Sequence, residues 1–323
     1  MGGDLAPGEI VAGAWTAHEG GAVDVLLVGP TDPVRAAAEA AGAKVGEGFE
    51  IVEAPETIPM DDPDPARAVR AKRNASVSVA ARLVKDGRAD AFFSAGATGA
   101  ALAAGVLHTG RIRGIARPGI ATVLPFPGAA TVLLDAGANA DSRPDHLAGF
   151  AMLGSVFAEV SLGIAEPRVG LLSVGEEPGK GNELVKEAYP LIEALGLRFV
   201  GNIEGRDIPA GAADVVVTDG FTGNVVLKLL EGFSKFLMEQ LLELFDRDDQ
   251  TRKAADVLLP GLLELRSALS PDTYGGAQLL GVKGVCIIGH GSSNAGAVRA
   301  AMAAAVRAVD GRLVERVSER LER

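Results

Sequence analysis

One loop of this chain, Asp219–Asn224, combines a carboxylate, two glycines and an amide within six residues. It follows Ala213–Thr218, an apolar run rich in β-branched residues that predicts a buried strand. A helix is predicted to begin at the loop, so the loop lies where a strand passes into a helix. Amides at a helix start point outward, the helix dipole favours negative charge, and glycine lets a ligand approach the backbone. The pattern therefore predicts a site for an anion.

The same order of strand, glycine-rich loop and helix recurs three more times. The loops Ser94–Gly99, Gly175–Glu183 and Gly289–Asn294 follow predicted strands at Ala91–Phe93, Val169–Leu172 and Val285–Ile288. One such loop carries little weight. Four of them after four strands predict an open α/β sheet of parallel strands with a ligand cleft at their carboxyl ends.

The composition restricts the classes of function. The 323 residues, 48% of them hydrophobic, suffice for one large core or two smaller ones. A net charge of −11 argues against general nucleic-acid binding, because no excess of positive charge attracts phosphate backbones. No signal peptide is visible and no apolar run is long enough to span a bilayer, so the expected location is the cytoplasm.

The sequence gives little support for a metal site, a disulfide or a covalent nucleophile. Cys286 is the only cysteine, and its apolar neighbours predict a buried, inert thiol. The four histidines, at positions 18, 108, 146 and 290, lack the spacing of metal ligands. The chain has no Walker A motif, no G-x-G-x-x-G in a strand-to-helix turn and no G-x-S-x-G elbow. Neither a metal nor an organic cofactor is predicted.

Several charged side chains could contact a ligand. Lys180 lies between glycines just before a helix entered at Asn182, which favours a ligand-binding lysine over a solvated one. His290 lies in a glycine-flanked loop after a strand, where ligand contact and a structural role both remain open. Four cations crowd one predicted helix and are either a solvated face or a patch for an acidic partner or phosphate; they are Arg67, Arg70, Lys72 and Arg73.

Long helices complete the prediction. Pro65–Lys85 is predicted as one helix. Thr222–Phe245 carries its charges on one stripe, so it is predicted to be largely buried in a core or against a partner subunit. Arg252–Ala268 is predicted to break at Leu258–Leu263, because Pro260 and Gly261 disfavour a continuing helix. This break predicts a hairpin bend with leucines at its turn.

Together these loops resemble the bacterial phosphate acyltransferases, the acyl-carrier-protein:phosphate transacylases that start phospholipid synthesis. The resemblance covers nearly the whole chain. The motifs that carry it are Met1–Asp4, Ala68–Arg70, Ser94–Ala100, Leu133–Asn139, Lys180–Leu184, Gly201–Asp207, Asp219–Asn224, Tyr274–Ala277 and His290–Ser293.

The resemblance implies one domain over residues 1–323, with a helical hairpin inserted at about 222–270. Its implied fold is a three-layer α/β/α sandwich with a mostly parallel sheet, similar to phosphotransacetylases and to the isopropylmalate dehydrogenase type. It also implies a homodimer without organic cofactor that attaches peripherally to the membrane. A downstream enzyme would pass the acyl group to glycerol 3-phosphate. The implied membrane contact is the hairpin tip at Ala254–Leu263, with Val257, Leu258, Leu259, Leu262 and Leu263.

The reaction implied by the resemblance is attack of inorganic phosphate on the thioester of acyl carrier protein, which gives acyl phosphate and free carrier protein. Phosphate is already a nucleophile at neutral pH, so the protein has to position it and stabilise an oxyanion. The cradle for phosphate and oxyanion is predicted at Lys180, Gly181, Asn182, Gly223 and Asn224. Asp219 and Asn139 are predicted to orient neighbours, and His290 to relay a proton to the leaving thiolate. Further substrate contacts are predicted at Gly96, Thr98, Gly99, Asp135 and Ser292.

The chain departs from the family pattern in three places, one of which is Ala75 beside Ser76, where serine is frequent. A short strand usually precedes the Met-Gly-Gly-Asp motif, so an upstream extension of Met1 is expected to complete the sheet. Ala97 stands where asparagine is usual, so an asparagine side chain is not essential at this position.

Two rival functions remain open. A phosphotransacetylase-like enzyme would use acyl-coenzyme A, whereas a non-catalytic membrane scaffold would have no use for four anion loops.

Overall fold

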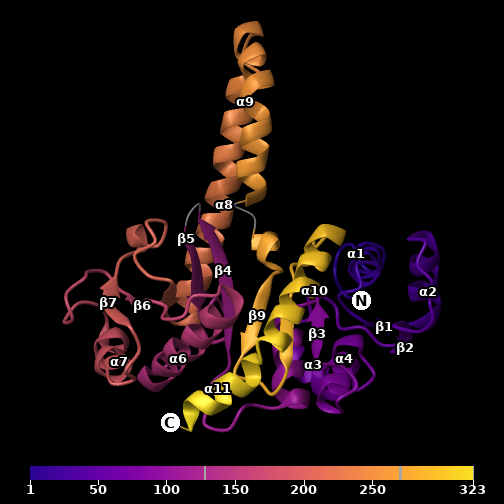
Figure 1. The fold of residues 1–323 in the computed structure, drawn as a ribbon, viewed down its shortest axis with the longest axis horizontal. Helices are drawn as coiled ribbons and strands as arrows, with labels where there is room; N and C mark the ends of the chain where they lie inside the picture. Colours follow the sequence, from indigo (N-terminus) through magenta and orange to yellow (C-terminus); the bar gives the residue numbers. More distant parts are fainter. Residues whose placement is uncertain (127–128, 269–270, 323) are drawn as a thin grey trace.

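The computed structural model describes residues 1–126, 129–268 and 271–322. Its centre is an eight-stranded sheet with helices on both faces (Figure 1). In spatial order the strands are β3 (Ala91–Ser94), β10 (Val285–Ile288), β9 (Ala277–Leu280), β4 (Gly119–Phe126), β5 (Ala129–Leu134), β8 (Val215–Val217), β6 (Val169–Leu172) and β7 (Phe199–Ile203). The predicted α/β class is confirmed.

Successive side chains of a strand point to opposite faces of the sheet. Since helices cover both faces, the strands are buried on both. Val132 and Leu134 enter one hydrophobic core, while Leu133 between them enters the other. The first core is covered by α6 (Pro144–Ser161), α7 (Glu183–Glu193), α10 (Ala295–Asp310) and α11 (Leu313–Leu321). The second is covered by α3 (Pro65–Ala71), α4 (Ser76–Lys85), α5 (Thr98–Ala104) and the first turns of α8 (Gly220–Phe245). The predicted three layers are thus present.

A smaller unit carries the amino-terminal part of the chain. Its two parallel strands are β1 (Val25–Gly29) and β2 (Phe49–Glu53). They pack with α1 (Gly8–Glu19) and α2 (Thr31–Ala40) into a third core, to which Val298 of α10 also belongs. This unit lies at the β3 side of the molecule (Figure 1).

The predicted single cleft at the carboxyl ends of all strands is wrong. β10 is parallel to β3, but three successive antiparallel pairings lead from β10 through β9 and β4 to β5. β8, β6 and β7 then run parallel to β5. The carboxyl ends of β3 and β10 therefore lie at one edge of the sheet, and those of β5, β8, β6 and β7 at the opposite edge. Strand direction follows from pairing partners far along the chain, which a local motif does not reveal.

The helix predicted over Pro65–Lys85 is interrupted. α3 ends at Ala71 and α4 begins at Ser76. Between them the backbone amide of Asn74 donates to Glu56 Oε2 over 3.1 Å, and the amide of Ser76 donates to the Glu56 carbonyl over 3.0 Å. These bonds to a distant segment replace the local helical ones.

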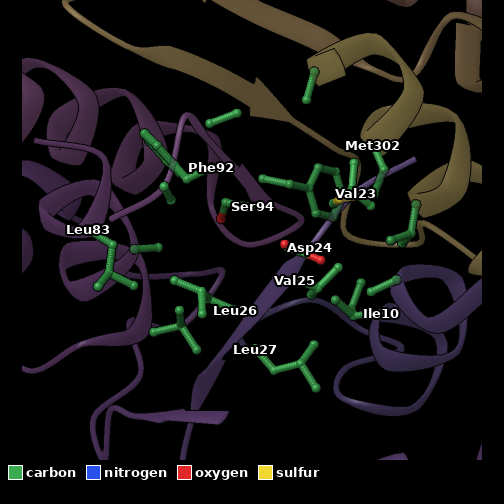
Figure 2. A pocket seen from close by; sticks show the side chains of 18 of the residues that line it. Ile10, Val23, Asp24, Val25, Leu26, Leu27, Leu83, Phe92, Ser94 and Met302 are labelled. Carbon is green, nitrogen blue, oxygen red and sulfur yellow. The ribbon is translucent and has the colours of Figure 1, made fainter. Parts of the chain in front are cut away.

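A cavity of about 780 Å³ separates β1 from β3 (Figure 2). It is lined by every residue of Val23–Val28 and of Asp90–Ala95, so it runs along an edge of each strand. Within the described ranges β1 pairs only with β2, and β3 only with β10. Backbone N–H and C=O groups of both edges therefore face the cavity and need hydrogen-bond partners. An acyl chain has no hydrogen-bond donors or acceptors along its length, whereas an extended peptide strand could form hydrogen bonds with both edges through its backbone.

The position of Met1 sets the direction of such a strand. Met1 lines the cavity, and burial lowers the pKa of its amino group. Its side chain lies against Gly29 at the carboxyl end of β1, and Gly2 approaches Gly96 just beyond β3. A strand leading into Met1 would thus run parallel to both neighbours.

We expect an extension of five β-branched residues before Met1 to stabilise the protein. Each buried Val or Ile contributes roughly 1.5–3 kcal/mol, and a few kcal/mol correspond to a rise in melting temperature on the order of 5 °C or more in a chain of this size. Calorimetry measures the shift, with a Gly/Ser extension of equal length as the control. Equal melting temperatures for both extensions would show that the cavity does not accept a strand.

Two long helices, α8 and α9 (Asp249–Ala268), leave the sheet region as a stalk (Figure 1). The predicted break at Pro260-Gly261 is wrong: α9 continues through Pro260, and the chain turns instead at Asp246–Asp248. Only Gly220 and Gly223 of α8 are buried, so the prediction of a helix inside a core of this chain is also wrong. None of the helices in the described ranges is both long and apolar enough for a membrane span.

Candidate active site

Three loops from distant parts of the chain meet at the carboxyl ends of β3 and β10. We call Met1–Asp4, Ser94–Gly99 and Gly289–Ser293 together the β3–β10 site. The amide of Asp4 donates to the Gly291 carbonyl over 2.8 Å, and the amide of Gly289 donates to the Ser94 carbonyl over 2.9 Å. These bonds join all three loops into one surface.

Glycine is required where these loops touch. A Cβ on Gly3 would lie 2.9 Å from the Ala95 carbonyl oxygen and 3.2 Å from that of Gly291. A Cβ on Gly291 would lie 2.8 Å from the Met60 methyl carbon, but this is the end of a flexible side chain that can move, unlike the backbone atoms next to Gly3. The glycines therefore bring the three loops close together, and Thr98 and Gly99 stay exposed at their rim.

His290 is exposed in this site and is held by its own loop. Its Nδ1 lies 2.7 Å from Ser292 Oγ, and the Ser292 amide donates to the same nitrogen over 3.3 Å. Across the parts of the chain that the structure describes, Nε2 has no hydrogen-bond partner. The ring is therefore oriented through one nitrogen while the other is available to a ligand.

The start of α10 behind this loop does not take an external anion. Asn294 caps the helix by accepting from the Ala297 amide over 3.0 Å. The Ala295 amide donates to Glu9 Oε2 over 2.7 Å, so a carboxylate from α1 already occupies this end. Glu9 stands 286 positions away in sequence, and no local signal pointed to it.

The opposite edge carries Asp135, a predicted substrate contact. Its carboxylate is fully buried and accepts five hydrogen bonds. The donors are the amides of Ile120, Gly137, Ala138 and Asn139 and the Asn139 side chain, at 2.8 to 3.1 Å. Asn139 also donates to the Pro118 carbonyl over 2.8 Å. Asp135 thus organises its loop and has little capacity left for a ligand.

Backbone amides at the start of α8 already donate hydrogen bonds to other groups of the protein. Asp219 is its N-cap and accepts from the Thr222 amide over 2.9 Å and from the Thr222 hydroxyl over 2.8 Å. The Gly220 amide donates to the Asn139 carbonyl over 2.8 Å, and the Gly223 amide donates to the Asp219 carbonyl over 2.9 Å. A Cβ on Gly223 would collide with the Asp135 carbonyl oxygen. These glycines therefore admit neighbouring backbone, whereas the sequence pattern had suggested room for a ligand.

The loop Ser173–Glu183 after β6, the Lys180 loop, lies at this same edge and is more open. Lys180 is exposed, and Asn182 caps α7 by accepting from the Val185 amide over 3.0 Å. Asn202 of β7 donates to the Glu177 carbonyl over 2.8 Å. Among the residues that the structure describes, neither Asn202 Oδ1 nor the Ser173 hydroxyl, both buried, has a hydrogen-bond partner. This loop is the second candidate for an anion.

The structure therefore divides the predicted site residues between two edges. Gly96, Thr98, Gly99, His290 and Ser292 meet in the β3–β10 site. Asp135, Asn139, Asp219, Gly223 and Asn224 meet at the opposite edge, beside the Lys180 loop with Gly181 and Asn182. A strand of four residues is about 13 Å long, so one small ligand does not bridge both groups along the sheet.

The setting of the single cysteine agrees with the sequence-based expectation. Cys286 is fully buried, and burial raises the pKa of its thiol far above the usual range. The prediction of a buried thiol is confirmed. Among the residues whose placement the structure describes, no group of three or more His, Cys, Asp or Glu side chains could hold a metal ion.

Comparisons with known proteins agree with this architecture. The family model described as "Fatty acid synthesis protein" matches residues 1–316. A phosphate acyltransferase of Desulfitobacterium hafniense is 47% identical over 324 residues, covering 100% of this chain and 96% of that protein. One of Thermus thermophilus is 47% identical over 322 residues, covering 99% of this chain and 96% of that protein.

Two solved structures share the fold. A phosphotransacetylase from Streptococcus pyogenes aligns with a TM-score of 0.62 at 18% identity, covering 94% of this chain and 91% of that one. EutD phosphotransacetylase from Staphylococcus aureus aligns with a TM-score of 0.58 at 15% identity, covering 93% and 89%. The expected likeness to phosphotransacetylases is confirmed at the level of the fold.

Proposed function

Since this chain belongs to the phosphate acyltransferase family, we propose that it transfers a fatty acyl group from acyl carrier protein to inorganic phosphate. The product, an acyl phosphate, would then serve as acyl donor for glycerol 3-phosphate in phospholipid synthesis. The protein is an acyltransferase. The carrier-bound substrate and the later step are the parts that we propose.

The observation that carries the proposal is the convergence of three glycine-rich loops at the β3–β10 site, with an oriented and exposed His290 among them. Acyl transfer to phosphate needs no covalent intermediate on the protein. It needs backbone donors for phosphate and oxyanion, and a group that handles one proton. We place the reaction at this site, and the Lys180 loop is the rival location.

The proton balance assigns a role to His290. An oxygen of HPO₄²⁻ attacks the thioester carbon, the oxyanion forms, and its collapse breaks the carbon–sulfur bond. The proton brought by phosphate ends on the thiolate, so the overall reaction releases none. Because Nδ1 accepts from the Ser292 amide, Nε2 carries the ring proton; His290 gives this proton to the leaving thiolate and regains one at Nε2 from phosphate. Thr98 and Gly99, exposed beside it, line the phosphate.

The direct test is incubation with phosphate and palmitoyl carrier protein, followed by trapping of acyl phosphate with hydroxylamine. Palmitoyl hydroxamate formed only in the presence of phosphate supports the proposal. Equal or better turnover with palmitoyl-coenzyme A would instead indicate the phosphotransacetylase-like activity. Binding of membranes without any hydroxamate would indicate a scaffold.

The stalk is proposed as the contact with a second copy and with the membrane. Exposed apolar side chains recur along one side of α8, and contiguous apolar surface of this kind marks interaction sites. They are Phe221 (67% exposed), Val225 (51%), Leu229 (67%), Phe233 (57%) and Phe236 (55%). Of the predicted membrane residues on α9, Val257, Leu258 and Leu263 are exposed, while Leu259 and Leu262 are half-buried. We assign the α8 stripe to the homodimer and the α9 residues to the lipid.

Two double variants separate these contacts. Val257→Glu with Leu258→Glu should abolish co-sedimentation with liposomes but leave a dimer, since two inserted side chains supply roughly 3–6 kcal/mol. Leu229→Glu with Phe233→Glu should instead yield monomers in light scattering. All four side chains are exposed in the single chain, so both variants should fold. Liposome binding by the α9 variant at the level of the unmodified protein would contradict the membrane assignment.

A further inference from the structure

One segment has a charge opposite to that of the whole protein. Residues 65–88, which form α3 and α4, contain seven cations and one acid, Asp86, whereas the chain as a whole has a net charge of −11. The cations are Arg67, Arg70, Lys72, Arg73, Arg82, Lys85 and Arg88. We call these side chains the basic face.

The charges of the basic face are not neutralised by the protein. Within the part of the chain that the structure describes, none of the seven forms an ion pair. Lys72 Nζ donates to the Thr57 carbonyl over 3.2 Å, and Arg82 donates to the Arg73 carbonyl over 2.5 Å. Such bonds to neutral carbonyls hold the side chains in place but leave their charge.

The unpaired cations of the basic face affect the neighbouring His108. The pKa of His108 is lowered, first by burial and then by the charges of Arg82, Lys85 and Arg73. Arg73, which follows α3, and Arg82 and Lys85 of α4 therefore all contribute to the lowered pKa of His108. Five of the seven side chains, Arg67, Arg70, Arg73, Lys85 and Arg88, are exposed.

The basic face borders the β3–β10 site. Helix α3 packs against α5, and a Cβ on Gly99 would lie 3.1 Å from Pro65 at the start of α3. Thr57, which Lys72 contacts, lies beside Gly2. The α3 part of the basic face and Lys72 thus lie beside the loops where we place the chemistry, whereas the end of α4 lies at the opposite edge, where Val84 is next to Gly284.

A second group of cations, Arg111, Arg113 and Arg117, lies elsewhere. Arg111 pairs with Val282 beyond the end of β9, and Pro118 accepts a bond from Asn139. This group therefore belongs to the edge that holds Asp135, opposite the β3–β10 site. Of these two groups, the basic face is the one that reaches the β3–β10 site.

We propose that the basic face is the docking surface for an acidic carrier protein that delivers the acyl thioester to the β3–β10 site. This inference rests on the proposed function. An acidic partner would be repelled by most of this protein, so a local positive surface next to the site would steer its approach and orient it. Removal of these charges should slow association and flatten its dependence on salt.

The test compares Arg70→Glu/Arg73→Glu with Arg111→Glu/Arg113→Glu, a matched pair of double charge reversals. For the first variant we expect a Kd for holo-acyl carrier protein, and a KM for palmitoyl carrier protein, raised roughly tenfold or more at low salt. Turnover of palmitoyl-pantetheine, which lacks the acidic protein, should stay within about twofold. The second variant should behave like the unmodified protein.

Other results would overturn the proposal in distinguishable ways. Unchanged carrier binding in the first variant, or weaker binding only in the second, excludes docking at the basic face. Normal carrier binding with loss of binding to phosphatidylglycerol vesicles would assign the face to anionic lipid. If the unmodified protein binds the carrier through this face but makes no acyl phosphate, docking stands and the proposed reaction fails.

Discussion

Replacement of His290 by alanine should lower kcat with palmitoyl carrier protein by about 100-fold, the lower range for loss of a positioned acid–base group. Its melting temperature should change little, because the side chain is exposed and bonds only within its own loop. The hydroxamate assay measures turnover at saturating phosphate. Ser292→Ala should produce a smaller loss, since it removes one of the two contacts to Nδ1 and leaves Nε2 in place.

Lys180→Ala is the matched comparison, because Lys180 is also exposed in a loop after a strand but lies at the opposite edge of the sheet. With the reaction at the β3–β10 site, we expect kcat and the phosphate KM to change by no more than about threefold. Loss of a strong donor to the developing anion would cost on the order of 100-fold. A 100-fold loss for Lys180→Ala with a nearly normal His290→Ala would move the active site to the Lys180 loop.

Replacement of Gly223 by alanine should destabilise the protein by about 3 kcal/mol, the upper part of the range for overpacking. The new methyl group would collide with the Asp135 carbonyl oxygen and with the Thr218 side chain. Since the first obstacle is backbone, it cannot yield by a rotamer change. Helix α8 would have to move away from the Asp135–Asn139 loop and give up the Gly220–Asn139 hydrogen bond. Urea unfolding at equilibrium measures the change.

Gly232→Ala in the same helix provides the control. A Cβ at Gly232 would have no neighbour within 4 Å, so only the helix propensity changes. Alanine is favoured over glycine there by about 1 kcal/mol. We therefore expect Gly232→Ala to be neutral or stabilising. Equal effects of the two substitutions would show that the close approach of α8 to Asp135 does not matter for stability.

Sequence alone was sufficient for the strands before the glycine-rich loops, for two helix caps and for the order of the motifs. The apolar runs before the glycine-rich loops are strands, and the helix starts predicted near Asn182 and Asp219 are capped by those side chains. The apolar setting of Cys286 predicted its burial. The order of motifs predicted the family, which the comparisons confirm. Caps, alternation and motif order are local properties, so they can be read from the chain directly.

The tertiary structure decided which of these local features meet and which remain open to a ligand. Three antiparallel pairings reverse half of the sheet, and they separate His290 from Lys180 although both follow strands in the same manner. The amides at the start of α10 and α8 are occupied by Glu9 and by Asn139, partners that no spacing along the chain reveals. Pro260 lies inside a continuous helix, and the chain turns at Asp246–Asp248 instead. Strand direction and the occupancy of helix ends depend on contacts between distant segments, and these exist only after the chain has folded.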